Sequence, residues 1–327
     1  MKIRTRDNLM TLDAAQIHSA TVFLLGELER LDPRINEPLQ RFTWGRDLPI
    51  RSDVSLADEV SSFTRDFFAS PGNQRADGKH FIGSNTTQIA GVQARRELYR
   101  QPLLPWGIEI NYSIFDLVRS QALGRPIDQT KISAVQRIYQ GEMDEIAYIG
   151  DPTLDVTGLV NNEDVVISPA GTKSGGGTAW TINTDAHEIL EDMNRLIADV
   201  SDSTNDTVTP TKILMPTNQY RMIATRRLGE IDHITILKFL KDNNASNDVS
   251  GQMLDIYPCK WLDEAGTAGT SRMVAYAQNE EFIRIPVVGL LRTPLHEEGM
   301  FFNFHYYTAV AGVEIVYPET IGYMDGI

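Results

Sequence analysis

Four kinds of residue in this sequence could carry chemistry: a glycine-rich stretch, six histidines, one cysteine and many carboxylates. The stretch GTKSGGGT, residues 171–178, resembles a phosphate-binding loop, but the first glycine that such a loop needs before its lysine is absent. Lys173 and Ser174 therefore predict a surface loop. No two histidines have the spacing that places two imidazoles on one helix face, and no motif beside Cys259 would activate its thiol. We expect no catalytic residue, metal site or cofactor.

The carboxylates are so abundant that a pair serving as general acid and base carries little information without geometry. One group stands out, because Glu142, Asp144 and Glu145 lie near the carboxyl end of a predicted helix, where negative charge is unfavourable. Two interpretations remain open. We favour a solvated acidic face, and the alternative is a face that pairs with arginines of a neighbouring element or subunit.

The helix that carries these acids begins after Pro126, and Gly150 and Pro152 end it. Its apolar residues recur every three or four positions and predict one buried stripe: Ile132, Val135, Ile138, Tyr139, Met143, Ile146 and Ile149. Gly141 near the middle costs the helix about 1 kcal/mol relative to alanine. We therefore expect neighbouring elements to hold this helix in place.

Composition limits the classes of function. The 327 residues can bury a sizeable core, and 30 basic against 44 acidic side chains give a net charge of −14. That charge argues against a grip on nucleic acid along the whole sequence. A single cysteine forms no intrachain disulfide and suits a reducing cytoplasm. Without a signal-peptide pattern or an apolar run of about 18 residues, we expect a protein that is neither secreted by a standard signal nor membrane-spanning.

Taken in order, the chain predicts parts of different character. An amphipathic helix over 13–31 precedes a stretch that proline and glycine interrupt repeatedly, which indicates an extended arm. Residues 56–98 predict two long polar strands around a turn-rich centre at 70–79. Such a hairpin is marginal alone, so we expect it to rest on another surface through its apolar residues: Phe63, Phe67, Phe68, Phe81 and Ile82.

The second half of the chain alternates helices and strands up to about residue 284, as in a mixed sheet covered by helices, and then becomes strand-like. The tail places Phe302, Phe304, Tyr306, Thr308 and Val310 on one face of a strand. The sequence thus predicts an α+β protein with an arm and a long hairpin.

A family resemblance goes further than these patterns. Residues 142–162, EMDEIAYIGDPTLDVTGLVNN, resemble the hallmark of phage major capsid proteins and encapsulin-type shell proteins, in which a long spine helix ends in an acidic pair, an apolar step and glycine. The family's Gly-Leu-Leu-Asn-like exit corresponds to Gly158, Leu159, Val160 and Asn161. GIEINYSIFDLVRSQALGRPI upstream and AGVEIVYPETI downstream are similar to the family's approach to the spine helix and its closing strand.

The resemblance implies the Hong Kong 97-like capsid fold and its parts. These would be an N-terminal arm (1–55), an extended loop (56–98), a peripheral domain with the spine helix (99–165 and 285–327) and an axial domain (166–284). It also implies self-assembly into pentamers and hexamers of an icosahedral shell around double-stranded DNA, held without sequence-specific binding. The candidate inter-subunit contacts are Phe67, Phe68, Lys79, Phe81, Glu142, Asp144 and Glu145.

The same resemblance implies partners and a location: other copies of the chain, a portal, possible decoration or scaffolding proteins, no membrane, the virion, and the host cytoplasm during assembly. Two alternatives remain, an encapsulin-type compartment that encloses protein cargo and a mixed α/β enzyme. Some capsids of this fold join a loop lysine to an asparagine of the next subunit. Lys79 and Asn303 would be the residues here, but neither lies in a motif, and we favour a solvated lysine and an ordinary strand asparagine.

Overall fold

The computed structural model describes residues 42–70, 80, 91–115, 127–154, 156–229, 234–244, 246–247, 251–294 and 296–327. The predicted helix over 13–31 and most of the arm lie outside these residues, and so does the turn-rich centre of the hairpin. Lys79 and Phe81 belong to the part that is not described.

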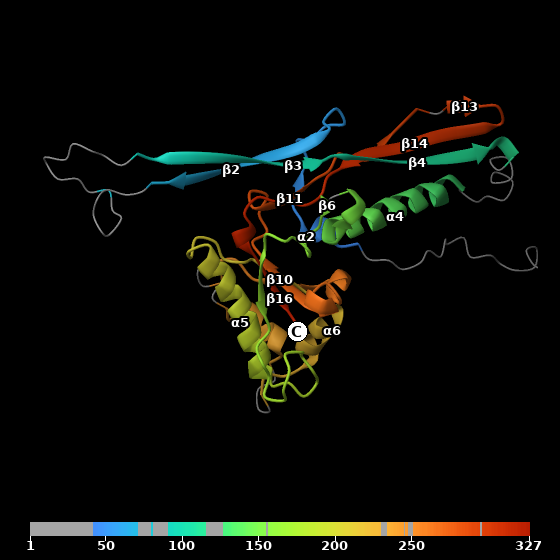
Figure 1. Cartoon of the computed structure of the whole chain (residues 1–327). Helices are drawn as coiled ribbons and strands as arrows, with labels where there is room; N and C mark the ends of the chain where they lie inside the picture. The colour runs from blue at the N-terminus through green and yellow to red at the C-terminus, as the bar shows by residue number, and fades with distance from the viewer. Residues whose placement is uncertain are drawn as a thin grey trace, which may run out of the picture.

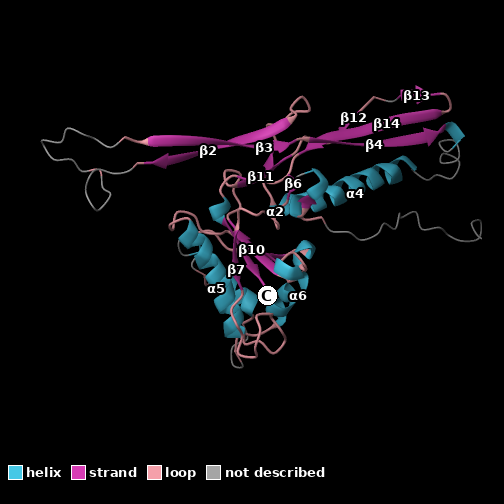
Figure 2. Cartoon of the chain, in the orientation of Figure 1, coloured by secondary structure: helices cyan, strands magenta, loops and turns pink. Residues whose placement is uncertain are grey.

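Two long antiparallel ribbons form an extended layer of strands. Strands β2 (Val60–Ala69) and β3 (Gln93–Pro102) pair along their whole length, and β4 (Leu104–Ser113) does the same with β14 (Phe301–Val310). Short strands β12 (Leu291–Arg292) and β13 (His296–Glu298) pair with the other edge of β14. Figures 1 and 2 show that the two ribbons extend in opposite directions from the middle of the molecule. The hairpin predicted from the sequence is the β2–β3 ribbon.

Helix α4 (Ile127–Tyr148) runs beneath the β4–β14 ribbon (Figure 1). Its buried residues include Val135, Tyr139 and Met143, and Val135 packs with Phe302, Phe304 and Tyr306 of β14. The predicted stripe was wrong at Ile138, which is 43% exposed. Because each residue turns a helix by about 100°, Ile138 points roughly 140° away from Met143. Ile138 lies three positions from the buried Val135, as the pattern requires, but its side chain points away from the buried face that Tyr139 and Met143 share.

The carboxyl end of α4 is closed by the segment that follows it. Gly150 has a φ of 76°, and a Cβ there would overlap the carbonyl of Val156. Short strands β5 (Gly150–Asp151) and β6 (Val156–Thr157) flank the 3-10 turn Pro152–Leu154. The predicted helix end is therefore confirmed, and Gly150 is required there by both its backbone angle and its surroundings.

A separate lobe contains a five-stranded mixed sheet in the order β7-β16-β10-β8-β9. In this order, the strands span Val166–Pro169, Ile321–Asp325, Arg272–Tyr276, Lys212–Met215 and Asp255–Pro258. Helices α5 (Ala186–Ser203), α6 (Thr217–Thr225) and α7 (Ile236–Asp242) pack against this sheet and enclose an apolar core. We call this unit the lobe (Figure 1).

The last strand changes the expected division of the chain. Strand β16 pairs with β10 and β7 inside the lobe, although residues 285–327 were all expected beside the spine helix. The tail enters the lobe because β16 is buried on every residue and completes its sheet.

Short elements join the strand layer to the lobe. Helix α2 (Trp44–Asp47) leads into β1 (Ile50–Arg51), which pairs with β11 (Ile283–Pro286), and β11 pairs with β15 (Glu314–Ile315). The 3-10 turns Lys260–Leu262, Thr267–Gly269 and Pro318–Thr320 complete the regular structure. A second apolar core runs through this junction from α4 to β10.

Within the described residues, no helix combines the length and hydropathy that crossing a membrane requires.

Candidate functional site

The glycine-rich loop does not form a phosphate site. Lys173 is buried, and its ammonium donates to the carboxylate of Asp192 on α5 and, at 3.3 Å, to the carbonyl of Glu188. Trp180 Nε1 donates to the same Asp192 carboxylate at 2.8 Å, and Gly171 N does so at 3.0 Å. Because the ammonium group of Lys173 is buried against Asp192, it is not accessible to an anion in the solvent. The predicted surface loop is confirmed at Ser174, which is exposed, but the prediction was wrong for the buried Lys173.

The other candidates for chemistry do not converge either. Burial raises the pKa of the Cys259 thiol to about 12, so the reactive thiolate is suppressed at neutral pH. Among the described residues, no group of three or more histidine, cysteine or acidic side chains is placed to hold a metal ion.

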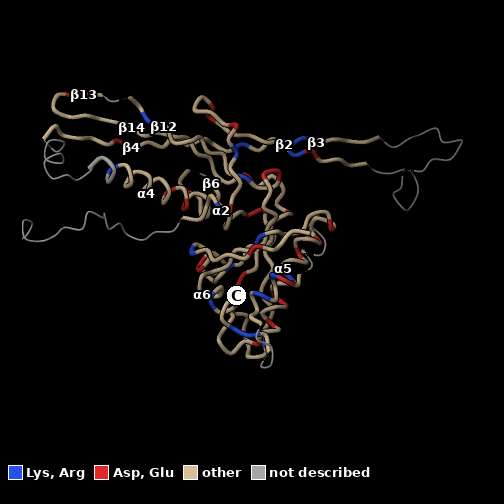
Figure 3. Tube along the Cα trace, turned by 180° about the vertical axis from the view of Figure 1, so that it is seen from behind, with Lys and Arg blue, Asp and Glu red and all other residues tan. Residues whose placement is uncertain are grey.

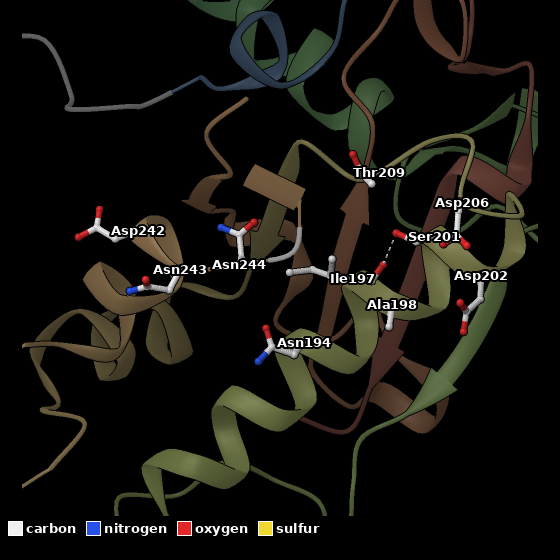
Figure 4. Close-up of a pocket in the computed structure, with 10 residues that line it drawn as sticks. All are labelled: Asn194, Ile197, Ala198, Ser201, Asp202, Asp206, Thr209, Asp242, Asn243 and Asn244. Carbon is white, nitrogen blue, oxygen red and sulfur yellow. Dashed lines mark hydrogen bonds between the residues drawn. The ribbon is translucent and has the colours of Figure 1, made fainter. Parts of the chain in front are cut away.

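A hollow of about 680 Å³ lies between α5 and α7. Figure 4 shows the carboxylate of Asp242 at one end of it and those of Asp202 and Asp206 at the other. The acids therefore face solvent separately and do not form a paired acid and base.

The feature that organises the molecule is a junction held by two buried carboxylates. Asp144 of α4 accepts hydrogen bonds from Thr43 N at 2.9 Å and Trp44 N at 3.2 Å, which are free amides at the start of α2. It also accepts from Trp261 Nε1 at 2.8 Å, and Lys260 Nζ lies 3.2 Å away. One carboxylate thus joins the spine helix to the end of the arm and to the lobe.

Asp47 forms the second half of the junction. Its buried carboxylate is paired with Arg46, at 2.6 Å from Nε, and with Lys212 of β8, at 3.2 Å from Nζ. The hydroxyl of Tyr148, at the end of α4, also donates to Asp47. Burial raises the pKa of Tyr148 above its ordinary value, which keeps that hydroxyl a donor. The arm, the spine helix and the lobe meet again at this residue.

The exit from the spine helix explains why the hallmark residues have their order. The amides of Leu159 and Val160 donate at 3.0 Å to the carbonyls of Ala147 and Tyr148, which have no partner within the helix. Asn161 Nδ2 donates to the Ile149 carbonyl at 2.6 Å, while its Oδ1 accepts from Gly158 N at 2.8 Å. The Gly-Leu-Val-Asn segment therefore caps α4 and returns the chain toward the lobe.

A third polar cluster fixes the root of the hairpin. Glu314 is fully buried and receives Arg284 Nε at 2.7 Å, Arg51 Nη1 at 3.2 Å and the hydroxyl of Ser61 on β2. Arg65 donates to the carbonyls of residues 315 and 316 and lies 4.2 Å from the centre of the Tyr99 ring. The hairpin therefore leaves the molecule at a fixed angle.

Beyond this root, the hairpin has apolar side chains with little cover. Phe68 is 73% exposed, Val92 71% and Leu98 51%, and Phe67 on the opposite face is 47% exposed. A two-stranded ribbon of this length is marginally stable by itself, and exposed apolar residues of this size mark interaction surfaces. The outer part of the hairpin is thus the most evident contact surface of the described residues.

The candidate contact residues fall into three groups. Phe67, Phe68, Glu142 and Glu145 are exposed, while Lys79 and Phe81 lie outside the described residues. The prediction of Asp144 as an inter-subunit contact is corrected, because Asp144 is 0% exposed and its partners lie within its own chain.

Two functional carboxylates, Asp47 and Glu314, were not predicted from the sequence. An isolated carboxylate in a loop or strand shows no pattern until the fold brings its cationic partners close to it.

Solved structures with the same arrangement are capsids and encapsulins. The capsid of Myoviridae phage XM1 is similar with a TM-score of 0.73 and 16% identity, covering 92% of this chain and 98% of that chain. The capsid of a native GTA particle gives 0.57 at 11% identity, with coverage of 90% and 95%. The encapsulin complex of Synechococcus elongatus gives 0.55 at 11% identity, with coverage of 93% and 95%. These likenesses establish the Hong Kong 97-like fold of capsid and encapsulin shells.

The family follows from the sequence comparison. The family model described as "Major capsid protein" matches residues 78–327, and the chain belongs to that family. No curated protein matches the chain. The predicted fold and the predicted role as a major capsid protein are thereby confirmed, and the family and the fold both point to a structural role in a self-assembling shell of the virion.

Proposed function

We propose that the chain forms the pentamers and hexamers of an icosahedral shell that encloses double-stranded DNA. The observation that carries the proposal is the hairpin: its root is fixed by buried ion pairs, but its outer apolar residues have no partner surface among the residues that the structure describes. A rigidly mounted arm with an uncovered end suits repeated contact with another subunit in a closed assembly.

The charge of the chain supports a container for DNA that does not bind it tightly. Figure 3 shows acidic and basic residues interspersed over the lobe, and the chain as a whole has a net charge of −14. A strongly basic surface would release counterions and hold the DNA backbone firmly. A shell wall that repels DNA weakly leaves the packaged DNA free to move. We expect its contact with the genome to be independent of the DNA sequence.

The assembly requires further partners and a place to form. We propose a portal at one vertex and, where the shell needs them, scaffolding or decoration proteins, with assembly in the host cytoplasm. We also propose four parts: an arm (1–55), an extended loop (56–98), a peripheral domain (99–165 and 285–320) and an axial domain, which is the lobe (166–284 with 321–327). Transferring the last residues to the axial domain follows the pairing of β16.

An encapsulin-type compartment is the second candidate, because an encapsulin shares the fold. Electron microscopy of particles from infected or expressing cells separates the two. A capsid yields closed shells that contain nuclease-protected DNA when the packaging proteins are present. Shells that always contain one protein cargo and never DNA would favour the compartment, and the absence of any shell would contradict both.

A further inference from the structure

A small apolar pocket opens between the spine helix and the beginning of β4. Its volume is about 140 Å³, and apart from Glu142 its walls are apolar. The lining residues are Leu104, Pro105, Trp106, Tyr139, Met143, Ile146, Leu154 and Val310. An apolar cavity of about 150 Å³ stays dry and accepts benzene. The pocket on α4 therefore has the size and the polarity for one phenyl ring.

The pocket walls are held in position before anything enters. The rings of Trp106 and Tyr139 lie edge to face with their centres 5.3 Å apart, and Trp106 Nε1 donates to the carboxylate of Glu142. At the rim, Pro105 is exposed and Leu154 is 46% exposed. A preformed pocket loses little conformational entropy on binding, which favours a specific apolar occupant.

The described residues offer a suitable ring at Phe68 of the hairpin. Phe68 pairs with Ala94 across the ribbon, so its cross-strand neighbour is small, and it is the most exposed aromatic residue in the described part of the hairpin. Leu98 lies on the same face and is also exposed, whereas Phe67 points to the opposite face beside Arg95. This face thus presents exposed Leu98 and Phe68 on either side of the Asp66–Arg96 ion pair, with Phe68 near the outer end.

The ring must come from another subunit. Phe68 lies eight residues beyond Val60 at the root, which places it roughly 26 Å along the ribbon at about 3.3 Å per residue. Figure 1 shows that the ribbon extends away from α4. The two strands contain four arginines and two carboxylates, and both carboxylates are already paired, Glu97 with Arg95 and Asp66 with Arg96. The ribbon keeps a net positive charge, which is opposite to that of exposed Glu142 and Glu145 beside the pocket.

We propose that the pocket between α4 and β4 of one subunit receives the phenyl ring of Phe68 from the hairpin of a second copy. This inference rests on the proposed shell, since it needs two copies side by side. It assigns the exposed face of the hairpin a defined receptor, and it gives Glu142 two roles, to hold Trp106 and to attract the basic ribbon.

Cysteine crosslinking tests the contact directly. Subunits with Phe68→Cys and subunits with Leu154→Cys are mixed, assembled and oxidised, so that a disulfide between them must be intermolecular. Disulfide-linked dimers are expected in the mixed particles, because such a bond requires Cα atoms within about 7 Å. A mixture of Phe67→Cys and Leu154→Cys is the matched control and should link far less, since residue 67 faces the other side. Equal linking in both mixtures, or none in the first, would overturn the proposal.

A second measurement tests how much the phenyl ring of Phe68 contributes to assembly. Phe68→Ala should raise the concentration midpoint of assembly about tenfold, as expected for an aromatic anchor in a pocket, and Phe67→Ala should change it much less. If a part of the chain outside the described residues fills the pocket instead, Phe68→Ala will leave the midpoint unchanged, which contradicts the inference. If wild-type subunits form no particle at all, the proposed shell itself fails. If wild-type particles form normally and the crosslinks are absent, only the pocket assignment fails.

Discussion

At the scale of single residues, Asp144 shows how one carboxylate can connect three parts of the chain. Asp144→Asn would keep one acceptor oxygen but place an amide donor either against Trp261 Nε1 or against the N–H groups at the start of α2, since these bond different oxygens of the carboxylate. We expect a loss of about 2–3 kcal/mol in the free energy of unfolding, measured by urea denaturation of dissociated subunits. Glu145→Gln, at an exposed position one residue away, should stay within about 0.5 kcal/mol. Similar losses in both variants would contradict the role of Asp144.

The buried face of the spine helix gives a matched pair of variants. Met143 is 2% exposed and Ile138 is 43% exposed, although both belong to the apolar pattern. Met143→Ala should cost about 2–4 kcal/mol because it leaves a cavity, and Ile138→Ala should cost less than about 1 kcal/mol. Urea unfolding of the two variants provides the comparison, and a larger loss at Ile138 would show that the helix is rotated from the position described.

The ion pair between Arg272 and Asp325 predicts a dependence on pH. Burial alone would raise the pKa of Asp325, but hydrogen bonds from Arg272, at 2.6 Å and 2.8 Å, and from Thr267 N outweigh burial and lower the pKa below its ordinary value of 3.8. Because the folded state binds this proton more weakly than the unfolded chain, the pair stabilises the subunit above the ordinary pKa. Its contribution is lost as the pH falls through the lower folded value.

The test compares the wild type with Asp325→Asn, which lacks the titrating group. From about pH 5 downward the free energy of unfolding of the wild type should fall more steeply than that of the variant, although the variant is less stable at neutral pH. Parallel curves for the two proteins would show that Asp325 has the same pKa in the folded and unfolded states.

At the scale of elements, a change in the hairpin should affect assembly without affecting the folding of the subunit. Its root is attached by Glu314 and Arg65, and the segment 70–79 is rich in glycine, proline and charge. Replacing that segment with a short Gly-Ser turn should leave the thermal unfolding of dissociated subunits unchanged, because the attachments that the structure describes are at the root of the hairpin. Particle yield, followed by light scattering against protein concentration, should fall because each subunit loses part of a repeated contact. Normal particles from this variant would remove the tip from the contact surface, and unfolded subunits would make it part of the core.

Several elements could be predicted from the sequence because local signals define them. The end of α4 at Gly150 and the tail strand that contains Phe302 and Val310 follow from glycine conformation and from alternating apolar residues, and both are confirmed. The direction of Ile138 and the pairing of β16 could not be predicted, because they depend on where α4 lies on the ribbon and on contacts between distant parts of the chain. The pocket beside Trp106 could not be predicted for the same reason, because its walls come from segments that are distant in the sequence: β4, α4, Leu154 and β14.

At the scale of the whole molecule, the strand layer and the lobe have different kinds of stability. The lobe has a continuous apolar core between its sheet and helices, whereas the described part of the hairpin is attached to the described core at its root. A subunit of this shape folds around its lobe and junction and leaves its ribbon uncovered. Contact with other copies would bury the ribbon surface that the described residues leave exposed, so the shape of this part of the subunit favours assembly.

Sedimentation of the purified protein at micromolar concentration, over a range of salt and pH, tests the central claim most directly. Because the described residues leave apolar surface on the hairpin exposed, and contact between copies would bury it, the account predicts a closed particle that sediments far faster than a single subunit and dissociates into smaller species on dilution or destabilisation. A stable monomer or dimer under all of these conditions would contradict the assignment of this chain to a self-assembling shell.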